Sequence, residues 1–429
     1  MFVIEGRECS AEISSQRDID RIAAELKQRA YRPVLGSIID AVLNAAAVDV
    51  ELPTDQILYG RYPYPHRRER FGIGEIFFRH HHAFVVMPAR KKLLVWGFRY
   101  HTRQPMMEQF CRDFEEATKA RLDKRAMDFT WKDISTRSRF ERYQEEGEEV
   151  TSGTQPTYTP EDAQRANSLS NKDTRLFVLQ LAQVRKLRAT DASANINIDT
   201  QRLIDDGLIK QEYLVSCRED SHTISTLPTK DLLEHVGEDF RCPVCNRPFG
   251  KELVQEIYVL TDAARSLLSG NRWMSIWITE LLLENGVERE DLRWGLEIDG
   301  EELDLMLNMG GLRVFFELKD REFGLGDAYP FVYRVSRYRG HWGVVVTTDK
   351  VAKNAKKFLE EQSKPTAIPP TSRIVDFKII EGADRIPQGI QDLVNELTKS
   401  AVLRIVAPFG ELIEHVVKAW LDAQIAQAI

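Results

Sequence analysis

Two segments in the C-terminal half of the chain alternate apolar and polar residues, as half-buried strands do. They read EELDLMLN and LRVFFELK, and the turn sequence Met309-Gly310-Gly311 joins them. The apolar residues of one face are Leu303, Leu305 and Leu307 in the first segment and Val314, Phe316 and Leu318 in the second. This pattern predicts an antiparallel hairpin through the two glycines.

The same reading predicts helices and further strands around the hairpin. RWMSIWITELLLENG is typical of a helix that ends at Gly286, and GVVVTTDKVAKNAKKFLEE is typical of a buried strand followed by an amphipathic helix. RIVDFKII predicts one more strand. Residues 383–429 then predict two amphipathic helices divided near Pro408, which would cap the core or form a dimer contact.

Three charged residues of the predicted hairpin occupy positions that alternate with these apolar residues. Asp304, Glu317 and Lys319 can therefore reach one face of the sheet. Two carboxylates can hold a hard cation such as Mg²⁺, while the ammonium can orient an attacking water or stabilise charge on a phosphate. A Glu-x-Lys sequence on a strand is commonly a pair of solvated charges, so the neighbouring elements decide between the two interpretations. Glu280 on the preceding helix has apolar neighbours at helical spacing, which favours a cation as its partner.

The order of these elements resembles the PD-(D/E)xK nuclease superfamily, and within it the Mrr-type restriction endonuclease branch. The shared order is a helix with Glu, a strand with Asp, a strand with Glu-x-Lys, a helix, and a strand ending in Thr-Thr, over about residues 271–362. The resemblance implies a restriction-endonuclease-like α/β core. In that core Asp304 and Glu317 would be the metal ligands and Lys319 the catalytic lysine.

Carried over by position, the resemblance makes Glu280 a further catalytic carboxylate, with Glu284 one turn on as the alternative. Relatives often have a glutamine or another polar group on the helix after Glu-x-Lys, whereas this chain has Tyr333, Arg334 and Arg337. The stretch REFGLGDAYP is glycine-rich and irregular where many relatives enter that helix directly. Both departures concern the substrate contacts more than the metal ligands.

Four potential ligands of a second metal lie further upstream. Cys217 and His222 are followed, after nineteen residues, by Cys242-Pro-Val-Cys245. Two thiolates on a tight knuckle plus a separated cysteine and histidine match a closed, tetrahedral Zn²⁺ site, and the aromatic Phe249 follows the knuckle. The alternative is that Cys217 and Cys242 are ordinary buried thiols and His222 a surface residue. In the zinc interpretation the insert would be disordered without metal.

The segments on either side of the cysteines are typical of a winged-helix module. INIDTQRLIDDGLIKQEYLV precedes them, with a helix that ends near Gly207, and LVQEIYVLTDAARSLLSG follows them. The zinc knuckle would then lie inside the wing. Such modules bind nucleic acid with a helix in the major groove, and the basic run at 185–188 fits this use. Basic runs are usually solvated helix faces, and the same fold also serves as a protein-contact module.

Composition limits the class of protein. The chain has 429 residues, 43% of them hydrophobic and 29% charged, which is ordinary for a globular protein of several domains. A net charge of -7 does not fit a protein that coats DNA by electrostatics, so any basic surface is local. Five cysteines without a disulfide pattern, the polar start MFVIEGREC and the lack of a long apolar stretch predict a cytoplasmic protein.

Changes in composition divide the chain into five predicted parts. They are an N-terminal α+β domain (1–143) for sensing or partner binding, a polar linker (144–172), the zinc-containing winged-helix-like module (173–270), the nuclease core (271–382) and the C-terminal helices (383–429). In the first part we expect helices at 16–30, 36–47 and 105–127 and strands near 74–79, 83–87 and 92–98.

The first part also contains the run Arg79-His80-His81-His82 beside RYPYPHRRERF. Aromatic residues between arginines can stack on an unpaired nucleic-acid strand. Adjacent histidines on one strand point to opposite faces, so they cannot all bind one metal. We expect a solvated loop and strand edge, or a protein-binding surface, rather than a nucleic-acid site.

These features predict a multidomain α+β protein whose C-terminal part is a Mg²⁺- or Mn²⁺-dependent endonuclease acting on DNA, with Zn²⁺ as a structural metal. The resemblance implies a role in restriction or anti-phage defence. One alternative is a non-catalytic DNA-binding or assembly protein that keeps a nuclease fold. Another is a nuclease subunit that is active only within a larger defence complex. Cleavage of both DNA strands with one site per chain would favour a homodimer.

Overall fold

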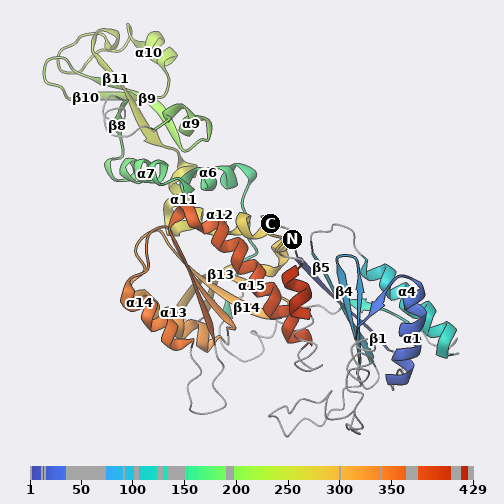
Figure 1. Ribbon diagram of the computed structural model, residues 1–429. Coiled ribbons are helices and arrows are strands. Elements are labelled where there is room, and N and C mark those ends of the chain that lie inside the picture. Colours follow the sequence, from blue (N-terminus) through green and yellow to red (C-terminus); the bar gives the residue numbers. More distant parts are fainter. Residues whose placement is uncertain are drawn as a thin grey trace.

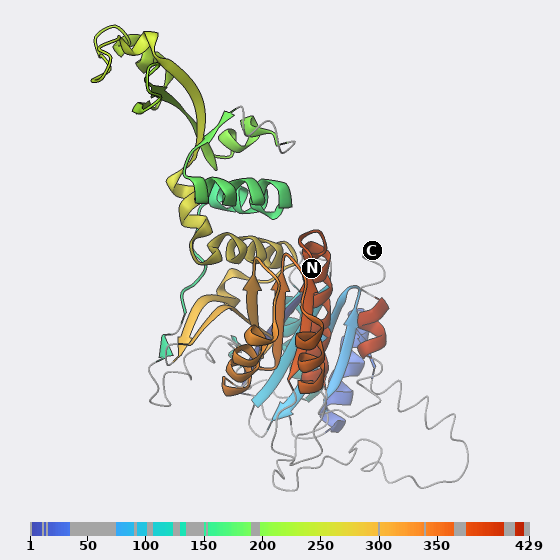
Figure 2. The ribbon, with the colours of Figure 1, turned by 90° about the vertical axis from the view of Figure 1, so that its left-hand side faces the viewer.

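A computed structural model describes residues 2–10, 13, 16–34, 74–89, 92–100, 106–122, 129–133, 150–151, 153–189, 198–298, 301–338, 340–363, 375–406 and 417–423. Over these residues the chain forms three β-sheets with helices packed around them, a mixed α/β architecture of several units (Figure 1). The smallest sheet extends away from the two larger ones in both views (Figure 2). Among the described helices, none combines the length and the hydropathy that a membrane crossing requires.

The N-terminal unit is built on an antiparallel six-stranded sheet with the order β2-β3-β4-β5-β1-β6. Its elements are β1 (Phe2–Cys9), α1 (Gln16–Gln28), β2 (Arg32–Pro33), β3 (Glu75–Arg79), β4 (His82–Ala89), β5 (Lys92–Tyr100), α4 (Met107–Leu122) and β6 (Lys132–Asp133). One face packs against α1 and α4 around Phe84 and Phe110. The other face packs against Val402, Val417 and Leu421 of the C-terminal segment. The three predicted strands are present, and β1 is a strand that the pattern did not reveal.

The histidine run lies in the tight turn between β3 and β4. Arg79 pairs with His82 across the hairpin, and the exposed residues His80 and His81 form its turn, where His80 has a φ of 52°. The prediction of a solvated loop at a strand edge is confirmed for these two histidines. The neighbouring RYPYPHRRERF segment and the helix expected at 36–47 lie outside the described residues.

The second unit contains a four-stranded sheet with the order β10-β9-β11-β8. Its elements are α6 (Pro160–Ser170), α7 (Lys172–Val184), β8 (Leu187–Arg188), α9 (Thr200–Asp205), β9 (Ile209–Ser216), β10 (Thr223–Leu227), α10 (Lys230–Val236), a 3-10 turn (Phe249–Lys251), β11 (Leu253–Leu260), α11 (Asp262–Leu268) and a second 3-10 turn (Ser269–Asn271). Gly207, with a φ of 69°, follows α9 where the sequence predicts a helix end. The left-handed conformation at this position suits glycine because it has no side chain.

The segment at 144–172, which we expected to be a linker, contributes α6 to this unit. Thr159 caps the helix by accepting a hydrogen bond of 3.2 Å from the backbone N–H of Asp162. Ala166 and Leu169 of the same helix are fully buried in the large apolar cluster. The few apolar residues of this polar segment lie three apart on one side of a helix, and its overall composition concealed them.

The third unit is a six-stranded sheet with the order β16-β15-β14-β13-β12-β7. Its elements are β7 (Val150–Thr151), α12 (Arg272–Glu284), a 3-10 turn (Arg289–Asp291), β12 (Leu292–Ile298), β13 (Glu301–Met309), β14 (Leu312–Lys319), α13 (Leu325–Arg337), β15 (Trp342–Thr347), α14 (Lys353–Gln362), β16 (Asp376–Glu381), a 3-10 turn (Ala383–Arg385) and α15 (Ile386–Val406). Strands β14, β15 and β16 are parallel, and the others are antiparallel. Helices α12 and α15 cover the face with Leu305 and Phe316, whereas α13 and α14 cover the face with Met306 and Phe315 (Figure 1).

The β13–β14 hairpin forms through the two glycines, as the sequence predicts. Met309 pairs with Leu312, and Gly310 and Gly311 have φ values of 56° and 80°. Positive φ at both central residues is what a two-residue turn of type I′ requires. The turn therefore sets the register of the whole hairpin.

Two local expectations for this sheet were wrong. Leu303 packs in the cluster of the α13 face and not with Leu305. Strand β12 is irregular between its pairs with these two residues, where Gly295 has a φ of 56°, so simple alternation does not hold there. The stretch REFGLGDAYP is not irregular throughout, since α13 begins within it at Leu325. The carboxylate of Asp327 accepts a hydrogen bond of 3.0 Å from the backbone N–H of Gly324 and so caps this helix.

Helix α15 connects the third sheet with the N-terminal sheet. Ile390 and Leu397 pack on the third sheet, and Val402 packs on the N-terminal one. Residues 417–423 are also helical, and Trp420 stacks on Phe78 with 5.2 Å between ring centroids. The C-terminal segment thus caps both sheets, which is one of the two roles expected for it.

Candidate functional site

Asp304, Glu317 and Lys319 come together where β13 begins and β14 ends. Both carboxylates lie one step beyond the last β13–β14 pair. The backbone N–H of Leu318 donates a hydrogen bond of 2.6 Å to Asp304 Oδ2, which holds this carboxylate against β14. Lys319 Nζ lies 2.9 Å from Glu317 Oε1. Three of the four residues that the resemblance assigns to catalysis therefore form one charged group, which we call the carboxylate cluster.

Arg334 of α13 is a fourth charged member of the carboxylate cluster. Its Nη2 donates a hydrogen bond of 2.7 Å to Glu317 Oε2, and its Nη1 donates one of 2.8 Å to the backbone carbonyl of Glu302. Glu317 is only 5% exposed, and each of its carboxylate oxygens contacts a cation, Lys319 or Arg334. Both contacts are therefore largely shielded from solvent. The sequence had marked Arg334 only as a departure from the family. Because Arg334 directly precedes the buried Val335 on an amphipathic helix, the sequence could have placed it at the border of the buried side of α13.

The electrostatics around Asp304 favour an additional cation. Burial, together with the negative charge of Glu317, raises the pKa of Asp304 from 3.8 to about 6. The Leu318 N–H and the positive charge of Lys319 act in the opposite direction and offset only part of this rise. A cation that neutralises the carboxylate pair would make the ionised form of Asp304 favourable.

The ligand atoms of the carboxylate cluster fit a hard divalent cation. Two carboxylates on adjacent strands supply oxygen ligands, and Mg²⁺ binds through oxygen while keeping several waters. Glu317 would exchange at least one of its contacts with Lys319 and Arg334 for the metal. Lys319, which is 21% exposed at its side chain, can then act on a water or a phosphate at the same place.

Glu280 is not part of the carboxylate cluster. It lies on α12, which packs on the opposite face of the sheet from α13. Glu280 accepts a short hydrogen bond from the hydroxyl of Tyr158, and its Oε1 lies 3.6 Å from Arg289 Nη2. The alternative residue Glu284 is exposed at the end of the same helix. The prediction that Glu280 is a further catalytic carboxylate therefore has no support in its contacts, and its apolar neighbours pack α12 on the sheet.

A buried ion pair connects the second unit to the end of β14. Arg175 Nε of α7 lies 2.8 Å from Asp320 Oδ1, and their side chains are 6% and 11% exposed. The hydroxyl of Thr348 donates a hydrogen bond of 2.6 Å to the same carboxylate. Arg175 also lies 5.4 Å above the ring of Trp273. Because Asp320 directly follows Lys319, the second unit holds the strand end that carries the candidate catalytic lysine.

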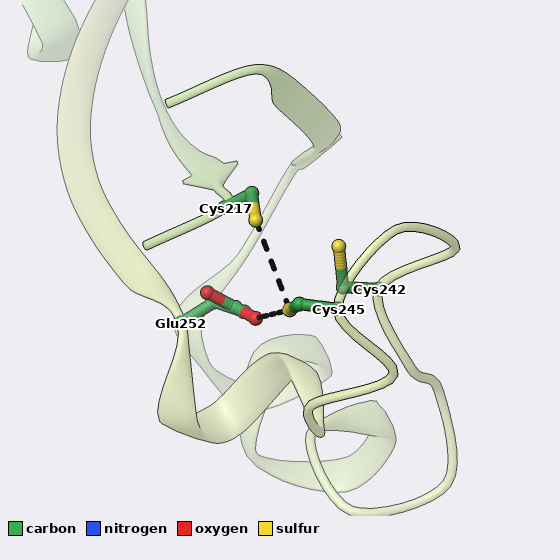
Figure 3. A group of neighbouring side chains, drawn as sticks. All are labelled: Cys217, Cys242, Cys245 and Glu252. Atoms are coloured by element: carbon green, nitrogen blue, oxygen red, sulfur yellow. Dashed lines mark hydrogen bonds between the residues drawn. The ribbon is translucent and has the colours of Figure 1, made fainter. Parts of the chain in front are cut away.

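Three thiols and a carboxylate meet at the outer end of the second unit (Figure 3). We call them the thiol cluster: Cys217, Cys242, Cys245 and Glu252, with ligand atoms that all lie within 4.8 Å of one another. The sulfur atoms of Cys217 and Cys245 are 3.7 Å apart. Two thiolates on one tetrahedral Zn²⁺, each bound at about 2.3 Å, would be about 3.8 Å apart. The thiol cluster can therefore hold a metal ion without a large rearrangement.

His222 lies beside the thiol cluster with its Nε2 3.9 Å from Cys242 Sγ. Its Nδ1 is held by a short contact with Asp220, so Nε2 is the atom directed to the thiols. A carboxylate on the far nitrogen is the usual partner of a metal-binding histidine. All four predicted zinc ligands are thus brought together.

Glu252 is the member of the thiol cluster that sequence reasoning missed. It is 3% exposed and accepts hydrogen bonds from the Cys245 thiol at 2.9 Å and from the Arg218 backbone N–H at 2.7 Å. Its pKa is lowered from the ordinary value of a glutamate, chiefly by the bond from Cys245. A glutamate seven residues after the knuckle follows no known ligand spacing, so no signal in the sequence could have found it.

The basic run at 185–188 is exposed where α7 ends and β8 begins, with only Leu187 partly buried. Arg185 ends the helix in a left-handed conformation with a φ of 65°. Lys186 Nζ donates a hydrogen bond of 2.8 Å to the hydroxyl of Thr226. The run is therefore a loop and strand edge and not the solvated helix face that such a run usually forms.

Comparisons with known proteins add little to this geometry. No protein-family model and no curated protein matches the chain. Protein VC1899 from Vibrio cholerae is similar in structure at 13% identity and a TM-score of 0.28, over 57% of this chain and 57% of that one. A repair endonuclease from Pyrococcus abyssi is similar at 13% identity and a TM-score of 0.17, over 46% of this chain and 96% of that one. Such low TM-scores support no functional assignment, which therefore depends on the two clusters.

Proposed function

We propose that this chain is a metal-dependent nuclease that hydrolyses phosphodiester bonds in DNA. The observation that carries the proposal is that Asp304 is held against the backbone of Leu318, between Glu317 and Lys319, which contact each other. There burial and the charge of Glu317 raise the pKa of Asp304. Two crowded carboxylates beside an ammonium match the needs of metal-assisted hydrolysis. The resemblance to the PD-(D/E)xK superfamily rests on residue order alone and supports the same chemistry.

Each member of the carboxylate cluster has its own role in this proposal. Asp304 and Glu317 hold Mg²⁺ or Mn²⁺, which when bound polarises the phosphate and makes a coordinated water more acidic. Lys319 orients the attacking water and compensates negative charge on the phosphate. Arg334 neutralises Glu317, and its guanidinium would also be able to donate to a phosphate oxygen bound beside that carboxylate.

In this proposal the second unit is a winged-helix-like module that positions the DNA, and its zinc is structural. Cys217, His222, Cys242 and Cys245 are the proposed ligands, and Glu252 accepts a hydrogen bond from the backbone N–H of Arg218 beside them. Four protein ligands leave no open position on a tetrahedral ion, so the zinc has no part in hydrolysis.

A non-catalytic role is the second candidate, and one observation favours it. Lys319 and Arg334 already neutralise Glu317, so the carboxylate cluster can persist as a buried ion group without metal. The chain would then bind DNA or partner proteins while keeping a nuclease fold. In either case the resemblance points to restriction or anti-phage defence in the cytoplasm, by the chain alone, as a homodimer, or within a larger complex.

Incubation of the purified chain with supercoiled, linear and single-stranded DNA and with RNA, in Mg²⁺, Mn²⁺ or EDTA, tests the proposal. We expect metal-dependent cleavage that falls on the order of 100-fold or more in Lys319→Met. Lys27→Met, which changes an exposed lysine on α1 of the N-terminal unit, is the matched control and should cleave normally. A folded wild type that cleaves no substrate with any metal would favour the second candidate.

A further inference from the structure

Two exposed tyrosines stand one helical turn apart on the solvent side of α13. Tyr329 is 56% exposed and Tyr333 is 54% exposed. Arg337 follows four residues later, with its guanidinium 5.9 Å from the Tyr333 ring centroid and its Nη1 donating a hydrogen bond of 3.1 Å to the Tyr333 hydroxyl. We call Tyr329, Tyr333 and Arg337 the tyrosine stripe, since residues four apart share one side of a helix.

The tyrosine stripe is not needed to pack α13 on the sheet. Ala328, Phe331 and Val335 form the buried side of the helix. Large exposed aromatic groups are rare on a surface without a partner, because they keep apolar area in contact with water. The stripe is therefore accessible to a ligand without any change in the packing of α13.

The same helix carries Arg334, whose guanidinium holds Glu317 of the carboxylate cluster. A ligand that crosses the tyrosine stripe thus lies on the helix that borders the candidate active site. On its other side the stripe meets α14, where the Tyr329 ring lies 4.4 Å from the ring of Phe358. Exposed Lys353 and Lys357 belong to α14 as well, and Lys357 Nζ lies 3.9 Å from Glu361 Oε1 on the same helix.

We propose that the tyrosine stripe binds an unpaired nucleic-acid strand by stacking its bases on Tyr329 and Tyr333. Arg337 and the lysines of α14 would contact its phosphates. Tyrosine faces accept bases of any sequence, and positive charge beside them attracts the backbone. Bases in a duplex stack on one another and cannot offer their faces, so the stripe selects single-stranded over double-stranded nucleic acid. The choice of a nucleic acid rests on the proposed function, which this inference deepens by naming the form of the substrate.

Binding can be measured separately from cleavage by fluorescence anisotropy in EDTA. The probes are a labelled oligo-dT of about 15 nucleotides, an RNA of equal length and a duplex of equal length. Tyr329→Leu and Tyr333→Leu should each weaken binding of the single strands about 5- to 100-fold and leave the duplex unchanged. Tyr329→Phe should bind as tightly as the wild type, because stacking needs the ring and not the hydroxyl.

Phe240→Leu is the matched control, because Phe240 is 57% exposed but lies near the thiol cluster. Equal losses in this variant, unchanged binding in the two tyrosine variants, or equal losses for duplex and single strand would each overturn the inference. So would a change of oligomeric state in the tyrosine variants, which would make the stripe a contact between copies of the chain. Intact strand binding without cleavage would instead contradict the nuclease proposal and leave the stripe standing.

Discussion

The carboxylate cluster and the thiol cluster are built in opposite ways. The carboxylate cluster stands on a six-stranded sheet with large apolar clusters on both faces. The thiol cluster stands on an insert whose own apolar cluster has Val215, Leu227 and Phe249 as its buried members. Such a small cluster cannot offset the conformational entropy of the ordered loops. In the proposed function, metal would therefore serve chemistry at the carboxylate cluster and local folding at the thiol cluster.

Removal of zinc should have the largest effect, and it should be confined to the insert. Metal contributes about 10–16 kcal/mol of apparent binding free energy in small zinc modules, so its loss should unfold residues 217–252. Hydrogen exchange after chelation, or in Cys242→Ser, should show rapid exchange over this range and unchanged protection in β13 and β14. Elemental analysis of the wild type should find one zinc per chain.

Matched variants distinguish the zinc ligands from their neighbours. His222→Ala should lower the zinc content, while Glu252→Gln should keep it, because Gln still accepts hydrogen bonds from the backbone N–H of Arg218. Cys111→Ser, at a buried thiol in the N-terminal unit, should also keep it. If the insert of a zinc-free protein were fully protected from hydrogen exchange, metal would not be needed for its folding, and this difference between the two clusters would disappear.

Loss of the Arg175 charge should have the next largest effect on stability, because Arg175 pairs with Asp320, the residue that follows Lys319 of the carboxylate cluster. Arg175→Met leaves Asp320 buried without its cation, which should lower the free energy of unfolding by about 3–5 kcal/mol. The double variant Arg175→Met with Asp320→Leu should recover most of that loss, because no charge is then buried alone. Urea unfolding of both variants measures the difference. A single variant as stable as the wild type would show that the second unit does not hold the end of β14.

Asp304→Asn should stabilise the metal-free protein at neutral pH. The pKa of Asp304 is raised from 3.8 to about 6 on folding, so the folded state binds its proton more tightly than the unfolded state. Stability from this group is therefore full below pH 3.8, falls as pH rises to about 6, and stays lost above it. The gain at pH 7 should be on the order of 1–3 kcal/mol. Urea unfolding in EDTA from pH 4 to pH 8 measures this. The expectation would be contradicted if the free energy of unfolding of the variant fell with rising pH as steeply as that of the wild type.

Glu280→Gln should have the smallest effect. Its side chain is 36% exposed, and its contacts are with Tyr158 and Arg289 rather than with the carboxylate cluster. We expect less than about 1 kcal/mol of lost stability and a cleavage rate close to that of the wild type. A large loss of cleavage without a loss of stability would restore Glu280 to the catalytic set.

Local patterns were enough to predict the hairpin and the meeting of Asp304 with Glu317. Alternation fixed the two strands, and the paired glycines fixed the turn between them. The proximity of the four predicted zinc ligands, Cys217, His222, Cys242 and Cys245, was predictable for a similar reason, because the spacing of such residues along the chain follows a recognisable pattern. In both cases the chemistry and the structure depend on residues that are close in sequence.

Contacts between distant segments could not be predicted in this way. Arg334 reaches Glu317 from a later helix, and Arg175 reaches Asp320 from another unit. The resemblance did not reveal that Glu280 lies away from Glu317, because the order of elements alone does not fix that α12 packs on the opposite face of the sheet from α13. Composition also misled for the segment at 144–172, where the few apolar residues of α6 determine the structure.

Single-turnover cleavage by Asp304→Asn tests whether the carboxylate cluster is a metal-dependent nuclease site. The variant should be at least as stable as the wild type and fully loaded with zinc. Its cleavage rate in Mg²⁺ should nevertheless be lower by about 100-fold or more. Stability and zinc content measured on the same samples exclude misfolding as the cause. Cleavage at the wild-type rate by this variant would contradict the account.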